Sequence, residues 1–170
     1  TFEESLLKGI RSLEIGVYHL YMSKFDGVAT KDLLDYIKHG TDDRIYAIAE
    51  LLRRNVSLQE IGEKTQIDNF FLRKLRNIID EEREIKNNPL DIETLFDAKK
   101  TGFSDKEIAK LWKKTEIEVF NLRKRENIFP VYKMIDTCSS EFKSYVPYFY
   151  STYEEENESI VSNKKKILVL

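Results

Sequence analysis

The sequence is poor in the residues that build redox and metal sites. Its 170 residues include one cysteine, Cys138, and two histidines, His19 and His39. A single cysteine excludes an internal disulfide and a cysteine-based zinc cage, and it is typical of a reducing compartment such as the cytoplasm. Neither histidine has a second metal-type residue at helical ligand spacing, and neither lies near Cys138 to act as a base. We expect no metal site and no nucleophilic cysteine.

The sequence also lacks a glycine-rich turn, a charge excess and a long apolar run. Its six glycines are never closer than seven residues apart, whereas a phosphate-binding turn gathers several at the start of a helix. The formal net charge of −2 provides no overall field for nucleic acid or an anionic membrane. No apolar segment approaches the roughly 18 residues of a membrane span. We therefore expect no nucleotide or other cofactor, no catalytic residues and no membrane association.

The sequence does have the composition and periodicity of a folded helical domain. Hydrophobic residues make up 41% and charged residues 34% of the chain, which is typical of globular proteins. Apolar residues recur at helical spacing behind capping residues in about seven or eight segments. This pattern predicts an all-α fold, an irregular helical bundle with an extended C-terminal tail. The predicted helices begin at, or are capped by, Phe2, Thr30, Thr41, Ser57, Asp68, Asp91, Ser104 and Thr115. The helix from Asp68 is expected to have one apolar side, made of Phe71, Leu72, Leu75, Ile78 and Ile79.

Part of the helical pattern is repeated. Residues 57–74 and 104–124 both contain Ser-x-x-Glu-Ile, then an isoleucine followed by an acidic residue, then Leu-Arg-Lys. In both copies the serine and the glutamate form a predicted capping box, and a third box begins at Thr115. Each copy is expected to form a short helix, a turn and a second helix. The fold is therefore expected to contain two related helical hairpins packed together.

The second copy also allows a different function. Its Ser-x-x-Glu-Ile-Ala run precedes a turn and a helix that carries basic residues at 123–125, which is the order of a helix-turn-helix DNA-binding motif. Basic residues late in a helix also complement the helix dipole without any partner. A DNA-binding module therefore stays open as the alternative to a non-catalytic scaffold.

The helical pattern ends at Pro130. Residues 131–153 are aromatic and rich in turn formers, and the glutamates of 154–158 are typical of a solvated linker rather than a cation site. The apolar run 167–170, which follows three lysines, predicts the first strand of a following domain. We therefore place a helical domain at 1–153 and a linker with a truncated strand at 154–170. The ends of the sequence suggest a segment of a larger protein.

Two runs in the C-terminal third are more specific than the helical pattern. Residues 129–142 read Phe-Pro-Val-Tyr-Lys-Met-Ile-Asp-Thr-Cys-Ser-Ser-Glu-Phe, and residues 150–156 read Tyr-Ser-Thr-Tyr-Glu-Glu-Glu. Together with 12–16, 41–50 and 67–72, they resemble the large subunit of carbamoyl phosphate synthetase around its oligomerisation domain. The signature positions, expected to be structural, are Pro130, Val131, Tyr132, Lys133, Asp136, Thr137, Cys138, Glu141, Phe142, Tyr150, Ser151, Thr152, Tyr153, Glu154 and Glu155.

The resemblance implies a role inside a ligase. In that family the domain lies between two ATP-grasp halves, which make carboxyphosphate from bicarbonate and phosphorylate carbamate. The parent enzyme uses ATP, magnesium or manganese, and potassium, takes ammonia from a small glutamine amidotransferase subunit, and feeds arginine and pyrimidine synthesis. No nucleotide, metal or effector residue of the family maps onto this chain. The implied partners are the other domains of the large subunit and further copies of it, with no nucleic acid and no membrane.

The sequence departs from the family pattern at a few loop positions. Asn55 stands where members usually have glycine, Asn69 stands where proline is common, and Ser139-Ser140 stand where alanines are usual. These departures affect the expected loop conformations rather than the resemblance.

Overall fold

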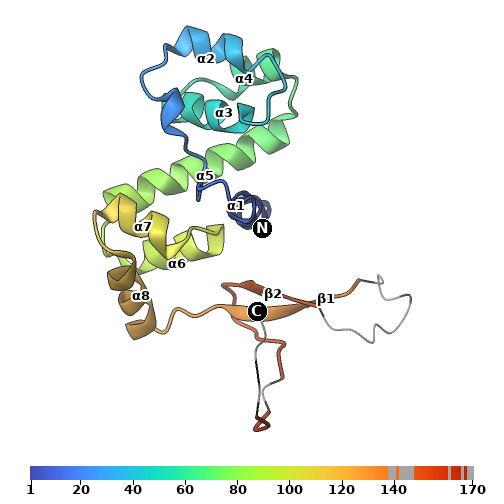
Figure 1. Ribbon diagram of the computed structural model, residues 1–170, viewed down its shortest axis with the longest axis vertical. Helices are drawn as coiled ribbons and strands as arrows, with labels where there is room; N and C mark the ends of the chain where they lie inside the picture. The colour runs from blue at the N-terminus through green and yellow to red at the C-terminus, as the bar shows by residue number, and fades with distance from the viewer. Residues whose placement is uncertain (138–140, 142–147, 161, 166, 168–170) are drawn as a thin grey trace. The chain divides into compact units, whose positions relative to one another are not determined.

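The computed structural model describes residues 1–137, 141, 148–160, 162–165 and 167 (Figure 1). The chain divides into two compact units, Thr1–Glu126 and Asn127–Leu170. The boundary predicted after residue 153 would separate this domain from the next domain of a larger protein, and it stays a prediction.

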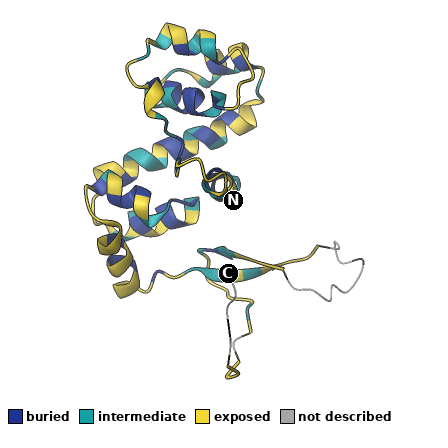
Figure 2. Ribbon diagram, in the orientation of Figure 1, coloured by how far each residue is buried: buried dark blue, intermediate teal, exposed yellow. Residues whose placement is uncertain are grey.

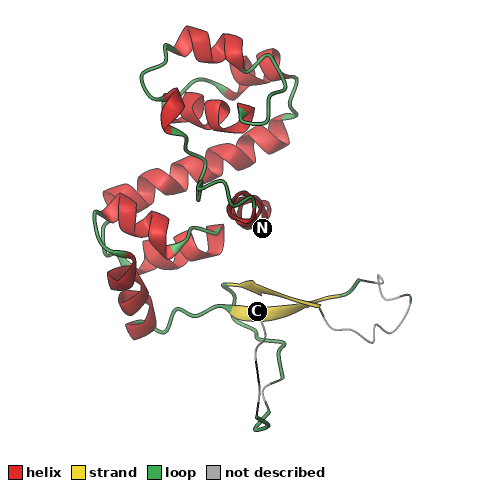
Figure 3. Ribbon diagram, in the orientation of Figure 1, coloured by secondary structure: helices red, strands yellow, loops and turns green. Residues whose placement is uncertain are grey.

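The first unit is helical throughout (Figure 3). It contains eight α-helices and one short 3-10 helix, which confirms the predicted fold class and the expected number of helices. Within the part of the chain that the structure describes, no helix is both long and apolar enough to cross a membrane. The helices are α1 (Phe2–Ser12), η1 (Ser23–Phe25), α2 (Thr30–Tyr36), α3 (Arg44–Arg53), α4 (Leu58–Thr65), α5 (Asn69–Asn87), α6 (Ile92–Thr101), α7 (Asp105–Trp112) and α8 (Glu116–Arg125).

The long helix α5 is the axis of the first unit. Helices α3 and α4 pack against it on one side of α1, and α6 and α7 pack against it on the other (Figure 1). Its apolar residues recur at helical spacing and are buried along its length (Figure 2). The core residues of α5 are Leu72, Leu75, Ile78, Ile79 and Ile85. Phe71, which we also expected in this core, is instead 46% exposed, because the first turn of α5 lies at the edge of the bundle.

The two repeated segments form the predicted helical hairpins. The first is α4 with the start of α5, and the second is α7 with α8; the helices of each hairpin pack against each other. Both short helices end at a residue in the left-handed conformation, Gln66 (φ 57°) and Lys113 (φ 55°). The repeated sequence therefore encodes a repeated local structure.

The predicted helix caps are mostly confirmed. The side chains of Ser57, Ser104 and Thr115 accept hydrogen bonds from the backbone N–H three residues later. A reciprocal bond, in which the glutamate accepts from the cap residue, is present only at Thr115, where Glu118 Oε2 lies 2.8 Å from the backbone nitrogen. The full capping boxes predicted at the two serines are therefore wrong, although both serines cap their helices.

The predicted starts of α2 and α3 are wrong by one and three residues. Thr30, which we expected to cap α2, is its first helical residue, and the N-cap is Ala29. Helix α3 begins at Arg44 rather than Thr41, with Asp43 as an N-cap that makes no side-chain capping bond. The Asp43 carboxylate is occupied by a salt bridge from Lys24 and by a hydrogen bond from the Tyr36 hydroxyl (2.6 Å). These two hydrogen bonds lower its pKa to about 2.

Backbone conformation accounts for two of the departures from the family pattern, and the third, Ser139-Ser140, lies outside the described residues. Asn55 has a φ of 62°, and asparagine is one of the few residues that tolerate the left-handed region favoured by glycine. Asn69 is the first residue of α5 after the N-cap Asp68, a position where proline is favoured because its missing N–H is not needed.

Gly102 allows α1 and α6 to approach closely. It ends α6 with a φ of 101°, and a Cβ atom there would lie 2.7 Å from Glu4 Cα. The Gly102 carbonyl also accepts a hydrogen bond from Arg11 Nη1 (2.8 Å). Glycine is therefore required here both for the helix end and for the contact with α1.

The second unit contains a β-hairpin that the sequence analysis missed. Strands β1 (Val131–Ile135) and β2 (Tyr148–Thr152) pair antiparallel, with Lys133 opposite Tyr150. The aromatic and β-branched residues were visible, but the two runs are too far apart for a short-turn hairpin signal. The strand predicted at 167–170 lies almost entirely outside the described residues.

Candidate functional site

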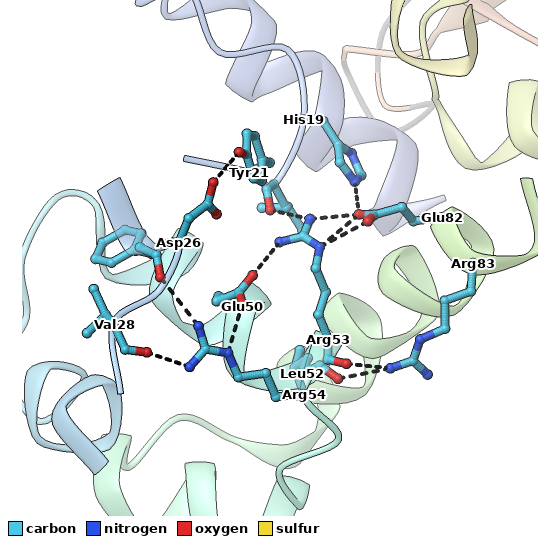
Figure 4. A network of polar contacts seen from close by, with 12 residues as sticks. His19, Tyr21, Asp26, Val28, Glu50, Leu52, Arg53, Arg54, Glu82 and Arg83 are labelled. Carbon is cyan, nitrogen blue, oxygen red and sulfur yellow. Dashed lines mark hydrogen bonds and ion pairs between the residues drawn. The ribbon is translucent and has the colours of Figure 1, made fainter. Parts of the chain in front are cut away.

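A buried polar network joins the connector, residues 13–29 between α1 and α2, to α3 and α5 (Figure 4). At its centre, the Glu82 carboxylate is hydrogen-bonded to His19 Nε2 (2.8 Å) and accepts from Arg53 Nη2 (2.6 Å). Burial acts to raise the pKa of Glu82, but the hydrogen bonds from His19 and Arg53 outweigh it and lower the pKa to about 2. Glu82 is therefore an ionised structural carboxylate rather than a general acid.

Arginines extend this network by donating to backbone carbonyls. Arg54 Nη1 donates to the Val28 carbonyl (2.6 Å), and Arg53 Nη2 donates to the Leu20 carbonyl (2.7 Å). Arg83 Nη2, on α5, donates to the Arg53 carbonyl at the end of α3 (3.0 Å). These guanidinium groups fix an irregular segment to the helical core, so the network has a structural role.

His19 is therefore assigned to the fold rather than to chemistry. It is only 4% exposed, and its ring lies 4.7 Å from the ring of Phe103. Among the described residues, no group of three or more histidine, cysteine, aspartate or glutamate side chains is arranged to hold a metal ion.

The largest cleft among the described residues lies between the connector and α7, and we call it the lysine cleft. It has a volume of about 690 Å³, and its lining includes Tyr18, Tyr21, Lys24, Lys106 and Lys110. The Lys106 ammonium lies 3.8 Å from the centre of the Tyr18 ring, and Lys110 lies 4.8 Å from that of Tyr21. The lining places cations over aromatic rings. Its Tyr21 hydroxyl donates to Asp26 Oδ2 (2.6 Å), and this hydrogen bond raises the pKa of Tyr21, which is the opposite of what an activated nucleophile needs. This arrangement favours binding over catalysis.

A second, more apolar cleft lies between α1, α3 and α5. It has a volume of about 320 Å³. We call it the aromatic groove and define it by Phe2, Leu6, Ile45, Phe71 and Leu75. Apolar clefts of this kind on a helical surface are typical of contacts with other protein segments.

Of the three basic residues behind the helix-turn-helix alternative, Lys124 and Arg125 are exposed, whereas Arg123 is held inside the fold. Arg123 is 9% exposed, and its Nη2 lies 3.0 Å from Asp105 Oδ2. Asp105 is also paired with Lys99 (2.7 Å). Arg123 therefore holds α8 against α7. The acidic residues Glu116 and Glu118 in the first turn of α8 would repel phosphate.

The signature positions of the two C-terminal runs meet in the β-hairpin of the second unit. Val131 faces Thr152, Tyr132 faces Ser151 and Lys133 faces Tyr150. Pro130 directly precedes β1, Asp136 and Thr137 follow it, and Tyr153, Glu154 and Glu155 follow β2. Glu141 is an exposed residue between the strands. Cys138 and Phe142 lie outside the described residues.

The acidic segment after β2 is not wholly a solvated linker, as we had expected. Glu156 and Glu158 pair with Lys133 at 3.3 and 3.6 Å. Glu158 also accepts a hydrogen bond from the Met134 backbone N–H (2.6 Å). The Glu156 side chain is still 84% exposed. The expectation is therefore wrong only for Glu158, where the segment folds back along β1. Sequence reasoning missed this contact because a charge run does not reveal its partner.

The fold and these clefts together define a helical interaction domain. A family model described as the carbamoyl-phosphate synthetase large chain, oligomerisation domain, matches residues 1–127. The chain therefore belongs to this family, which confirms the resemblance noted in the sequence. The match ends within one residue of the first compact unit, Thr1–Glu126, so the family domain and the helical unit coincide.

Proposed function

We propose that this chain is a non-catalytic scaffold of a carbamoyl-phosphate synthetase large chain, in which it spaces other domains and joins copies of the protein. The observation that carries the proposal is the family match over residues 1–127, which covers the whole helical unit. The contacts of His19 and Glu82 support it, because the carboxylate of this buried pair is also hydrogen-bonded to Arg53 and ties the segment after α1 to α3 and α5.

The proposal extends to the parent enzyme. It would make carbamoyl phosphate in the cytoplasm from glutamine-derived ammonia, bicarbonate and two ATP, with magnesium or manganese and potassium. Its product would serve arginine synthesis, pyrimidine synthesis or both, and a small amidotransferase subunit would supply the ammonia. Within this enzyme the helical unit would contact other domains of the same large chain and further copies of itself.

Calorimetric titration with ATP and magnesium tests the non-catalytic role. We expect no saturable heat and no release of phosphate, because the sequence contains no phosphate-cradling turn. Saturable ATP binding by the 170-residue chain would contradict the proposal.

Titration against random duplex DNA at low salt separates the scaffold from the alternative function. A DNA-binding module would bind with an affinity that falls steeply as salt is raised. We expect no such binding, since Arg123 is held by Asp105.

A further inference from the structure

The floor of the aromatic groove is built from helical positions four residues apart. Phe2 and Leu6 lie one turn apart on α1, and Phe71 and Leu75 lie one turn apart on α5. Side chains at i and i+4 share a helix face, so the two helices offer their apolar stripes to the same cleft. Ile45, on α3, closes the third side.

An aromatic cluster projects beside the groove. Phe70 and Phe71 lie in the first turn of α5, and their side chains are 48% and 46% exposed. Their rings lie 5.3 Å apart, and the ring of Phe2 lies 5.6 Å from that of Phe71. Phe70 therefore packs against two rings that line the groove, those of Phe2 and Phe71, and Lys74 Nζ lies 5.7 Å from the centre of its own ring. Exposed aromatic groups around a cleft are typical of interfaces.

The rim of the groove carries one charge of each sign. Asp42 and Arg44 both line it. Among the described residues, neither makes an ion pair, and Arg44 Nη2 donates to the Thr65 carbonyl (3.2 Å). Both charges are thus available to a partner that presents the opposite sign at each position.

We infer that the aromatic groove is the surface through which two copies of this chain associate about a twofold axis. Phe70 of each copy enters the groove of the other, and Asp42 of each copy faces Arg44 of the other. A twofold contact uses the same patch on both copies and requires it to be self-complementary. This patch meets that requirement, because a projecting ring lies beside a hollow and an anion lies beside a cation. The inference rests on the proposed scaffold function, which includes self-association.

The lysine cleft does not meet the same requirement. A twofold contact there would bring Lys106 and Lys110 of one copy towards the same lysines of the other, and like charges across an interface oppose association. Of these two clefts, only the aromatic groove presents complementary charges when the same surface of two copies meets.

Sedimentation equilibrium of the 170-residue chain and its variants tests the inference. We expect the wild-type chain to dimerise reversibly and F70E to raise the dimer dissociation constant about 10- to 100-fold, since an aromatic anchor is replaced by a charge facing an apolar groove. The matched control is I117E, the same kind of change at a 59% exposed residue of α8, with an expected change below about twofold. Circular dichroism checks that both variants keep the helix content of the wild type.

A charge reversal gives a second, independent measurement. D42R and R44D should each weaken the dimer about 5- to 10-fold, and the double variant should recover most of the wild-type affinity, because the pairs re-form with their signs exchanged. Equal dimerisation by F70E and I117E, or no recovery in the double variant, would overturn the groove while leaving the scaffold function intact. A wild-type chain that stays monomeric at its highest workable concentration would also overturn it. The scaffold would then act through other domains of the large chain, whereas ATP binding would contradict the scaffold itself.

Discussion

Each half of the helical unit holds one carboxylate between two basic side chains, but the two networks connect different parts of the chain. Glu82 is paired with His19 and Arg53, which lie 63 and 29 residues away in the sequence. Asp105 is paired with Lys99 and Arg123, which lie 6 and 18 residues away. The first network fixes an irregular connector to two helices, whereas the second only joins α6, α7 and α8. Similar chemistry thus serves long-range folding in one half and local packing in the other.

The largest expected effect is the loss of the long-range network. Glu82→Gln removes the charge that pairs with Arg53 and is hydrogen-bonded to His19, and the ion pair left to Arg53 is the longer one from its Nη1 to Glu50 (3.6 Å). We expect this change to lower the free energy of unfolding by about 3 kcal/mol. Asp105→Asn is the matched variant in the other half, with an expected loss of about 2 kcal/mol, because α7 and α8, which Asp105 joins, also pack directly against each other. Urea unfolding followed by circular dichroism measures both. Equal losses would show that the two networks do not differ in role.

The sequence analysis predicted contacts between residues that are close in the chain, and it missed contacts between residues that are far apart in the chain. The N-caps at Ser57, Ser104 and Thr115 were predictable, because a cap depends only on residues within one turn. The partners of Glu82 were not, since no periodicity relates a glutamate to a histidine 63 residues earlier. The pairing of β1 with β2 and the exposure of Phe71 were missed for the same reason, as both depend on which segments meet in space.

Glu81, which directly precedes Glu82, gives a sharper form of the comparison. Burial raises the pKa of Glu81 to about 7, and the neighbouring charges of Asp97 and Glu84 add to the shift. Unlike Glu82, it has no cation to offset its burial. Two adjacent glutamates on α5 therefore titrate in opposite directions from the ordinary value of 4.5.

This difference predicts opposite effects of pH. The protonated Glu81 favours the folded state below pH 4.5, and that contribution is lost as the pH rises through about 7. The contribution of Glu82 is present above pH 4.5 and is lost as the pH falls through about 2. Glu81→Gln should therefore raise the free energy of unfolding at pH 8 by about 2 kcal/mol, after discounting for partial exposure, and change it little at pH 4. A gain that is the same at both pH values would show that Glu81 is ionised throughout.

The smallest expected effect concerns the caps of the locally stabilised half. Thr115→Ala removes the hydroxyl that accepts from the Glu118 N–H, but the backbone N–H of residue 115 can still donate to the Glu118 carboxylate. We expect a loss of about 1 kcal/mol in the free energy of unfolding, as for other N-cap threonines. Ser104→Ala is the matched variant, at a cap without the reciprocal bond, and we expect it to lower the free energy of unfolding by about the same amount as Thr115→Ala. Because α8 packs mainly on α7, hydrogen exchange should show the Thr115→Ala loss as faster exchange in α8, with the amides of α3 unchanged. Faster exchange in α3 as well would mean that the two halves unfold together and that the local network is coupled to the long-range one.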